Sequence, residues 1–426
     1  MSKSSLSSPH IRPLTGLRFF AAITVVMSHF AGTWRPGVVP AGNHARSPLL
    51  RFAGEVLARL SDYMGGPAVS LFFVLSGFIL VYVYASDAGT LRGPRRGFYV
   101  ARFARIYPVY LIGLVLALGP YLLWHTCTTG NSGCAASPRL PVILSSLVLL
   151  QGWDPMHLLF LNGPGWSLSD EAFFYALFPA IIPLVTRVRR QYLVPLIAGL
   201  YCFALLPSLL YAIIRPDGMH VGNLWDAFWF EMTYYCPLLR LPDFVVGVAL
   251  GWLFVQRQRE GAAIAAAIAR LRTGVGESIV LLGVTMLVII GVIPVLVPSL
   301  ALDPLLDTLL LPVMAALIYT TAWGQGSIAR SLGSGPLVLL GEASYGLYIL
   351  HWPLWVWYTH LLHQPTMGYL PRLSSLALFA LYLVILIGLS VACFRYVETP
   401  LRIAIRRALV SRRTPVPQLP LVRADL

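Results

Sequence analysis

The chain has 426 residues, of which 57% are hydrophobic and only 11% charged, and its mean hydropathy is +0.74. A soluble protein could not hide this much apolar surface, so the composition excludes a soluble class and predicts a polytopic, all-α integral membrane protein. The formal net charge is +14 and Lys3 is the only lysine, but the arginines gather between apolar runs. That distribution favours membrane topology, with membrane lipids around the chain, over the binding of nucleic acid.

The first part of the chain alternates apolar spans with basic loops. Residues 1–13 are polar and are expected to form a cytoplasmic tail, followed by an outward span at Leu14–Phe30. The loop at 34–66 contains apolar residues at helical spacing, Leu49–Leu60, which predicts a short interfacial helix. A second span, Pro67–Ala85, returns to the densest arginine cluster, which fixes the cytoplasmic side. The cluster comprises Arg92, Arg95, Arg96, Arg102 and Arg105.

The third span, about Ile106–His125, leads to an outer loop that holds Cys127 and Cys134. These two cysteines could pair if the loop faces an oxidising compartment. The five cysteines of the chain show no metal-ligand spacing, so we expect no metal.

The next apolar run is too short to cross a bilayer. If Pro141–Gln151 crossed, the arginines at 187, 189 and 190 would lie outside. We therefore interpret Pro141–Asp170 as a re-entrant or interfacial segment that is surrounded by protein or by a water-filled cavity. The span Glu171–Thr186 then runs inward.

The remaining spans are expected at 192–214, 241–256, 278–299, 305–323, 337–360 and 373–397. The total is about ten spans in a plasma (inner) membrane, with both termini cytoplasmic because the inner loops carry the arginines. The region 261–272 is expected to be a cytoplasmic helix or linker. Residues 14–400 would form a single transmembrane domain without a soluble partner domain, and 401–426 a basic cytoplasmic tail.

The first span carries an ionisable group at each end, Arg18 and His29. Eleven residues at about 1.5 Å each separate the two groups by roughly 16 Å along a helix. Because a charged group at the centre of a membrane helix costs roughly 2.5 to 3.5 kcal/mol, a retained one usually faces a cavity and has a function. The spacing suits a site that holds an anion at the inner surface and reacts with it deeper in. The alternative is that Arg18 anchors the helix end and His29 is a packing residue.

A second basic pair, Arg102 and Arg105, lies three residues apart and therefore on one helical face. Together with Arg18 it would make a pocket for phosphates, which arginine can contact in a bidentate manner. Membrane topology alone would also explain the pair.

Two further stretches hold candidate residues. In the first, Ser169 is expected to cap a helix with Asp170 and Glu171 in its first turn, and Glu171 lies near Trp166, a residue able to stack on a sugar. Capping alone would explain Asp170, and Glu171 is the better functional candidate. In the second stretch, His351 lies in mid-span two residues before Pro353, either as a ligand contact or as a link between helices.

Six segments taken together resemble the membrane-bound acyltransferase 3 family, in the family's order and over almost the whole chain. They are Leu14–Ala22 with His29, Phe72–Leu80, Arg102–Pro108, Trp166–Glu171, Ser344–Pro353 and Arg395–Arg402. The resemblance implies transfer of an acyl group, usually acetyl, from cytoplasmic acyl-CoA to a hydroxyl of a cell-envelope glycan, a lipid-linked sugar or a similar acceptor. Thr15 stands where the family often has an acidic residue before G-L-R, and Asp170 where it usually has an apolar one.

The resemblance also assigns roles to residues. Arg18, Arg102 and Arg105 would bind the phosphates of the acyl-CoA donor. His29 would act as general base or carry the acyl group transiently, and Glu171 would orient the histidine or the acceptor. Trp166, Asp170 and His351 are expected on the side of the acceptor substrate.

The competing hypothesis is a transporter or flippase of lipid-linked sugars. In that case His29, Glu171 and His351 would line a translocation path, and the arginines would only set topology. The sequence shows no evident internal repeat of the kind many transporters have.

Overall fold

The computed structural model of the chain describes residues 11–38, 48–123, 139–214, 216–217, 228–259, 280–289, 291–292, 295, 303–324, 326–362 and 375–410. Within these ranges the regular structure is helical, apart from one isolated bridge between Ala85 and Leu91, so the prediction of an all-α protein is confirmed. Four expectations lie outside the described residues: the tail before residue 11, the Cys127/Cys134 loop, the linker at 261–272 and the last 16 residues of the chain.

The helices are α1 (Arg12–His29), α2 (Ala31–Val38), α3 (Pro48–Tyr63), α4 (Gly65–Tyr84), α5 (Arg95–Leu123), α6 (Arg139–Leu147), α7 (Trp166–Thr186), α8 (Leu193–Ile214), α9 (Phe228–Tyr235), α10 (Pro237–Arg259), α12 (Asp303–Leu309), α13 (Leu311–Ala322), α14 (Gly326–Leu332), α15 (Gly335–Leu362), α16 (Ser375–Cys393) and α17 (Thr399–Leu409). Short 3-10 turns lie at Gln151–Trp153, Gly163–Gly165 and Arg190–Tyr192, and a π-helical segment at Phe394–Glu398 joins α16 to α17.

In the described ranges, six helical segments are long and apolar enough to cross a membrane. They are Phe52–Tyr84, Arg95–Leu123, Gly163–Thr186, Arg190–Ile214, Phe228–Arg259 and Ser375–Leu409. Helices α1 and α15, which carry polar groups of the candidate site, are not among the six, and the expected span 278–299 is described only in part. The expected span 305–323 is divided into α12 and α13, because Pro312 at the start of α13 cannot donate the backbone hydrogen bond that a continuous helix needs.

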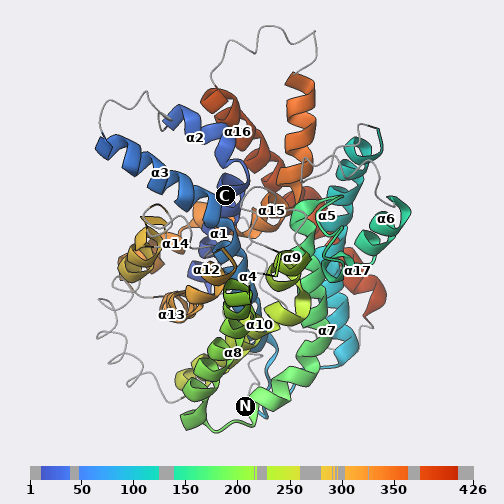
Figure 1. Cartoon of the computed structure of the whole chain (residues 1–426). Coiled ribbons are helices and arrows are strands. Elements are labelled where there is room, and N and C mark those ends of the chain that lie inside the picture. The colour runs from blue at the N-terminus through green and yellow to red at the C-terminus, as the bar shows by residue number, and fades with distance from the viewer. Residues whose placement is uncertain are drawn as a thin grey trace.

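The centre of the molecule is a set of closely packed helix pairs (Figure 1). Helix α4 packs against α10, and α1 packs against α15. A Cβ atom added at Gly77 would overlap the backbone of α10, one added at Gly247 the backbone of α4, and one at Gly341 the Thr15 carbonyl of α1. Small residues at these crossings let the helix backbones approach, which is the usual way membrane helices pack without a hydrophobic driving force between them.

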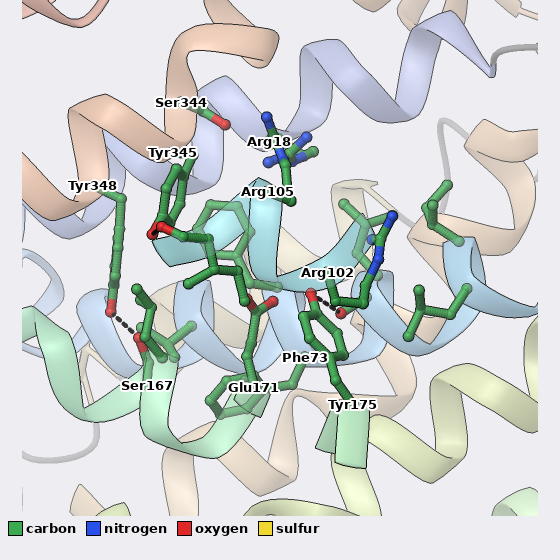
Figure 2. A pocket seen from close by; sticks show the side chains of 18 residues that line it. Arg18, Phe73, Arg102, Arg105, Ser167, Glu171, Tyr175, Ser344, Tyr345 and Tyr348 are labelled. Carbon is green, nitrogen blue, oxygen red and sulfur yellow. Dashed lines mark hydrogen bonds between the residues drawn. The ribbon is translucent and has the colours of Figure 1, made fainter. Parts of the chain in front are cut away.

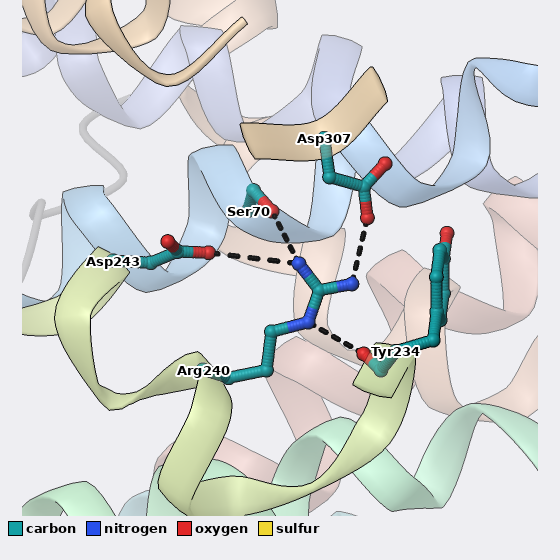
Figure 3. A network of polar contacts seen from close by, with 5 residues as sticks. All are labelled: Ser70, Tyr234, Arg240, Asp243 and Asp307. Atoms are coloured by element: carbon teal, nitrogen blue, oxygen red, sulfur yellow. Dashed lines mark hydrogen bonds and ion pairs between the residues drawn. The ribbon is translucent and has the colours of Figure 1, made fainter. Parts of the chain in front are cut away.

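A buried polar network ties α4, α9, α10 and α12 together (Figure 3). The Arg240 guanidinium donates to Asp307 at 2.7 Å, to the Tyr234 carbonyl at 2.5 Å and to Ser70 at 3.4 Å, and Asp243 lies 3.8 Å away. All of the side chains that meet the guanidinium are almost fully buried. A buried arginine is tolerated only with such partners, so this network stabilises the packing of the four helices.

The segment predicted to be re-entrant is a short helix, α6, followed by loops and 3-10 turns that are largely buried from Leu158 onward. Buried Gln151 donates to the Tyr110 hydroxyl and the Gly165 carbonyl, and buried Asn162 donates to the Ile349 carbonyl. These hydrogen bonds give backbone carbonyl groups the partners that lipid cannot supply. Irregular backbone occurs at the depth of a membrane only where protein or water satisfies its polar groups in this way.

Two expectations about this region are wrong. Helix α7 begins at Trp166, five residues before the expected span, so residues 166–170 are helical and not part of the loop. Ser169 does not cap the helix, because its hydroxyl donates to the Leu149 carbonyl. The helix predicted at 49–60 is confirmed as part of α3, and its interfacial position stays a prediction.

Candidate functional site

A cavity with about 860 Å³ of empty space opens between α1, α4, α5, α7 and α15 (Figure 2). Its polar lining consists of Arg18, Ser76, Arg102, Arg105, Ser167, Glu171, Tyr175, Ser344, Tyr345 and Tyr348. Its apolar lining consists of Val69, Phe72, Phe73, Leu75, Ile79, Leu80, Ile106 and Leu168. The cavity therefore combines a charged group of side chains with a long apolar wall.

The structure brings the three predicted arginines together at this cavity. Arg102 donates to the Tyr84 hydroxyl at 3.1 Å and lies over the Tyr84 and Tyr175 rings, at 5.2 and 5.8 Å from their centroids. The Nε atom of Arg102 is buried without a hydrogen-bond partner among the described residues. Aromatic rings hold the Arg102 guanidinium in place without neutralising its positive charge. The cavity can therefore attract an anion.

Glu171 lies in the same cavity as the arginines. Its carboxylate interacts with the Tyr175 hydroxyl one turn along α7 and electrostatically with Arg18, Arg102 and Arg105. One carboxylate cannot balance three guanidiniums, which leaves the cavity lining positive.

Trp166 and Asp170 lie outside the cavity lining, and the structure does not bring them to Glu171's side of α7. Trp166 is 5% exposed and packs on Tyr235 with ring centroids 4.7 Å apart. Asp170 is fully buried, and neither of its carboxylate oxygens has a hydrogen-bond partner among the described residues. Both residues would have to become accessible to contact an acceptor, so their assignment to the acceptor side stays a prediction.

The two histidines of the site meet each other. His29 Nδ1 lies 2.9 Å from His351 Nε2, and the rings are stacked at 14° with centroids 5.1 Å apart. His351 is fully buried, and its Nδ1 lies 2.5 Å from the Tyr348 carbonyl oxygen. The His29 side chain is exposed. Two histidines 322 positions apart in the chain thus form one unit at the packed α1/α15 interface.

The hydrogen bonds determine which nitrogen carries each proton. A carbonyl oxygen can only accept, so Nδ1 of His351 donates to Tyr348 and Nε2 of a neutral His351 carries the lone pair. That lone pair accepts from Nδ1–H of His29, and the lone pair of His29 is then on its Nε2. His351 therefore sets the tautomer of His29, a role we had expected Glu171 to fill.

The described cavity stops short of the histidine pair. Its lining on α15 ends at Tyr348, one helical turn before His351. The Tyr348 hydroxyl bonds to Ser167 at 2.7 Å, and the Tyr348 ring meets Phe72 edge-on at 5.9 Å. Tyr348 is therefore the lining residue of α15 nearest to His351 along the helix.

The sequence did not single out the tyrosines of the cavity. Tyr175, Tyr345 and Tyr348 all line it, and Tyr345 also lies under the Arg105 guanidinium at 5.8 Å. One signal was available, because Tyr175 follows Glu171 by four residues and Tyr348 precedes His351 by three, the spacings that share a helical face.

Residues 12–395 match the acyltransferase domain family over nearly the whole chain. Acyltransferase MdmB of Streptomyces mycarofaciens is 28% identical over 422 residues, which cover 96% of this chain and 94% of that protein. Peptidoglycan O-acetyltransferase OatA of Listeria monocytogenes is 22% identical over 408 residues, which cover 93% of this chain and 56% of that protein. No solved structure matches the chain. The match to a family of acyltransferases favours group transfer over a sugar carrier, and the chain belongs to the acyltransferase 3 family of integral-membrane acyltransferases.

Proposed function

We propose that the protein is a membrane O-acyltransferase that moves an acyl group, acetyl in the simplest case, from cytoplasmic acyl-CoA to a hydroxyl of a glycan, lipid-linked sugar or similar acceptor. Family membership supports the transfer of an acyl group. The observation that carries the proposal is the pairing of an arginine-lined cavity with a histidine whose tautomer is set for base catalysis.

The arginine group supports a phosphorylated donor. Arg18, Arg102 and Arg105 face one cavity, and guanidinium groups bind phosphate oxygens through two parallel hydrogen bonds. The apolar wall beyond them, which includes Phe73 and Leu75, suits the uncharged arm of a thioester donor. In this proposal the phosphates stay at the arginines and the thioester points toward Tyr348.

The transfer step uses the lone pair on Nε2 of His29. That nitrogen takes the proton from the acceptor hydroxyl while the hydroxyl oxygen attacks the thioester carbonyl carbon. The carbon–sulfur bond breaks, and the proton held by His29 passes to the departing thiolate, giving the acyl ester and CoA thiol. His351 holds the other nitrogen of His29 through the transfer.

Tyr348 and Phe72 separate the donor cavity from His29 in the resting protein. We propose that both side chains turn aside when the donor arm enters, so that the thioester reaches the histidine. Glu171 acts on the donor side, where its carboxylate offsets part of the positive charge of the guanidiniums and interacts with the Tyr175 hydroxyl.

The test is transfer of label from radioactive acetyl-CoA by the full chain in lipid nanodiscs, with membrane glycolipids added as acceptors. We expect label in the acceptor and one CoA thiol released per acyl group moved. His29→Ala should reduce transfer by about 100-fold or more, in line with the loss of a general base. His360→Ala, a histidine farther along α15, should leave transfer unchanged. A His29→Ala protein that folds, binds CoA and transfers at the wild-type rate would refute the assignment of the base.

The acceptor needs a separate experiment. The name of one relative, peptidoglycan O-acetyltransferase, supports a cell-envelope glycan. Mass spectrometry of envelope glycans and lipid-linked sugars from a deletion strain and its parent should reveal a species that lacks one acyl group, and complementation with His29→Ala should not restore it.

A further inference from the structure

Helix α17 brings additional arginines close to those of the cavity from the far end of the chain. The π-helical segment Phe394–Glu398 continues the helical chain from α16 into α17, and α17 packs against α5. Isolated π-helical turns often occur at functional sites, because they redirect a helix at a cost in stability. We had expected a basic tail from residue 401 onward, but residues 401–409 belong to this packed helix.

The link between α17 and the cavity is Glu398. Its side chain is 1% exposed and forms an ion pair with Arg105. Arg402, one turn farther along α17, lies 3.8 Å from the same carboxylate, and only 14% of its side chain is exposed. A single buried carboxylate therefore holds one arginine of the cavity and one of α17 side by side.

The charges of α17 act on the cavity. Arg402 interacts electrostatically with Arg18, Arg102 and Glu342, and Arg406 interacts with Arg402, Arg102 and Tyr84. Five guanidiniums thus gather here, and among the described residues that act on them the acidic groups are Glu171, Glu342 and Glu398. Five guanidiniums and three carboxylates leave an excess of two positive charges. Because the group is partly buried, the repulsion between its guanidiniums is screened less than it would be in water.

We propose that Arg402 and Arg406 bind phosphate groups of the donor and, with Arg18, Arg102 and Arg105, form a site for a ligand that carries several phosphates. The inference rests on the proposed function, because it extends the donor site of the same enzyme. A ligand with a diphosphate and a further phosphate supplies enough negative charge to balance the excess. Glu398 is a positioning residue that orients Arg105 and Arg402.

Arg402 and Arg406 lie on a different face of α17 from the neighbouring Arg407. Arg402 and Arg406 are four residues apart and share a helical face, and both interact electrostatically with Arg102 of the cavity. Arg407 is exposed and lies about 100° farther around the helix. Arg407 therefore carries the same charge on the same helix without reaching the cavity, which makes it the matched control.

The experiment measures the dissociation constant of tritiated CoA for the full chain in nanodiscs of zwitterionic phosphatidylcholine. We expect Arg402→Gln and Arg406→Gln each to raise this constant about tenfold, and Arg407→Gln to leave it unchanged. Arg402→Lys keeps the charge beside Glu398 and should recover part of the loss, which covers the case in which Arg402→Gln folds poorly. Thermal unfolding is recorded for every variant.

A second set of nanodiscs that contain anionic phosphatidylglycerol distinguishes the donor from lipid headgroups. The proposal is overturned if all three glutamine variants bind CoA like the wild type, if the wild type binds no CoA, or if the variants differ only in the anionic nanodiscs. The last result would make lipid headgroups the ligand of α17. A wild type that binds CoA with the expected losses in the variants, but transfers no acyl group, would refute the proposed function and leave this inference standing.

Discussion

Replacement of His351 tests whether it sets the tautomer of His29. His351→Leu removes the acceptor that lies 2.9 Å from Nδ1 of His29, whereas His351→Gln keeps a polar group able to accept near the position of Nε2. In the transition state His29 becomes positively charged, and a hydrogen bond to a charged group contributes about 1.5 to 3 kcal/mol. At about 1.4 kcal/mol per factor of ten, His351→Leu should lower kcat by about 10- to 100-fold.

The assay is steady-state acyl transfer in nanodiscs, with kcat and KM for the donor measured separately. The donor site lies beyond Tyr348, so KM for acetyl-CoA should stay within about twofold in both variants. His351→Gln should recover most of kcat, which a purely structural role of His351 would not produce. If the leucine and glutamine variants lose kcat equally while both unfold at the wild-type temperature, or if the loss appears only in KM, the positioning role is refuted.

Three further substitutions test charge and packing. Glu171→Gln removes the carboxylate among the guanidiniums and should lower the dissociation constant of CoA about threefold, so weaker binding would contradict the donor-side role. Gly247→Val places side-chain atoms against the α4 backbone and should destabilise the protein by about 1 to 3 kcal/mol, measured by thermal unfolding in detergent, whereas Gly388→Val, which meets open space, should not. Arg240→Met should destabilise by about 3 to 5 kcal/mol, because buried carboxylates lose their cation. Arg259→Met removes only an exposed ion pair with an aspartate and should destabilise the protein by at most about 1 kcal/mol. A larger loss of stability would contradict the argument that burial makes the Arg240 network important.

The sequence predicts the long apolar helices well, because the length of an apolar run is set by the bilayer and can be counted directly. The predicted span 192–214 corresponds to α8, and 337–360 to α15. The three arginines of the cavity were also predictable, since basic residues at helix ends and at a spacing of three residues are visible in the sequence alone.

The start of α7 could not be predicted in this way. An acidic pair at Asp170 and Glu171 has the pattern of a helix N-terminus, where the helix dipole favours negative charge. The helix begins earlier, at Trp166, and Ser167 in its first turn is hydrogen-bonded to the Pro164 carbonyl and to a distant partner, Tyr348 on α15. The partner lies 181 positions away, and no local pattern contains that information.

Contacts between residues far apart in the chain also explain why the histidine pair and the role of α17 could not be predicted from the sequence. His29 and His351 were each visible in the sequence as imidazoles within apolar runs, but their contact depends on the close packing of α1 and α15. Arg402 and Arg406 look like the basic residues that any cytoplasmic tail carries. Their place beside the arginines of the cavity depends on the packing of α17 against α5 and on the ion pair between Glu398 and Arg105.

The α1/α15 pair limits how the proposed transfer can take place. Arg18 and His29 belong to α1, Tyr348 and His351 belong to α15, and the two backbones meet closely where Gly341 faces Thr15. Because closely packed helices cannot slide by a fraction of a turn without overlap, the separation of Arg18 from His29 and the contact between the histidines are fixed together. The donor arm must therefore reach His29 by side-chain rotation at Tyr348 and Phe72, or by movement of α4 and α7 around a stationary α1/α15 pair.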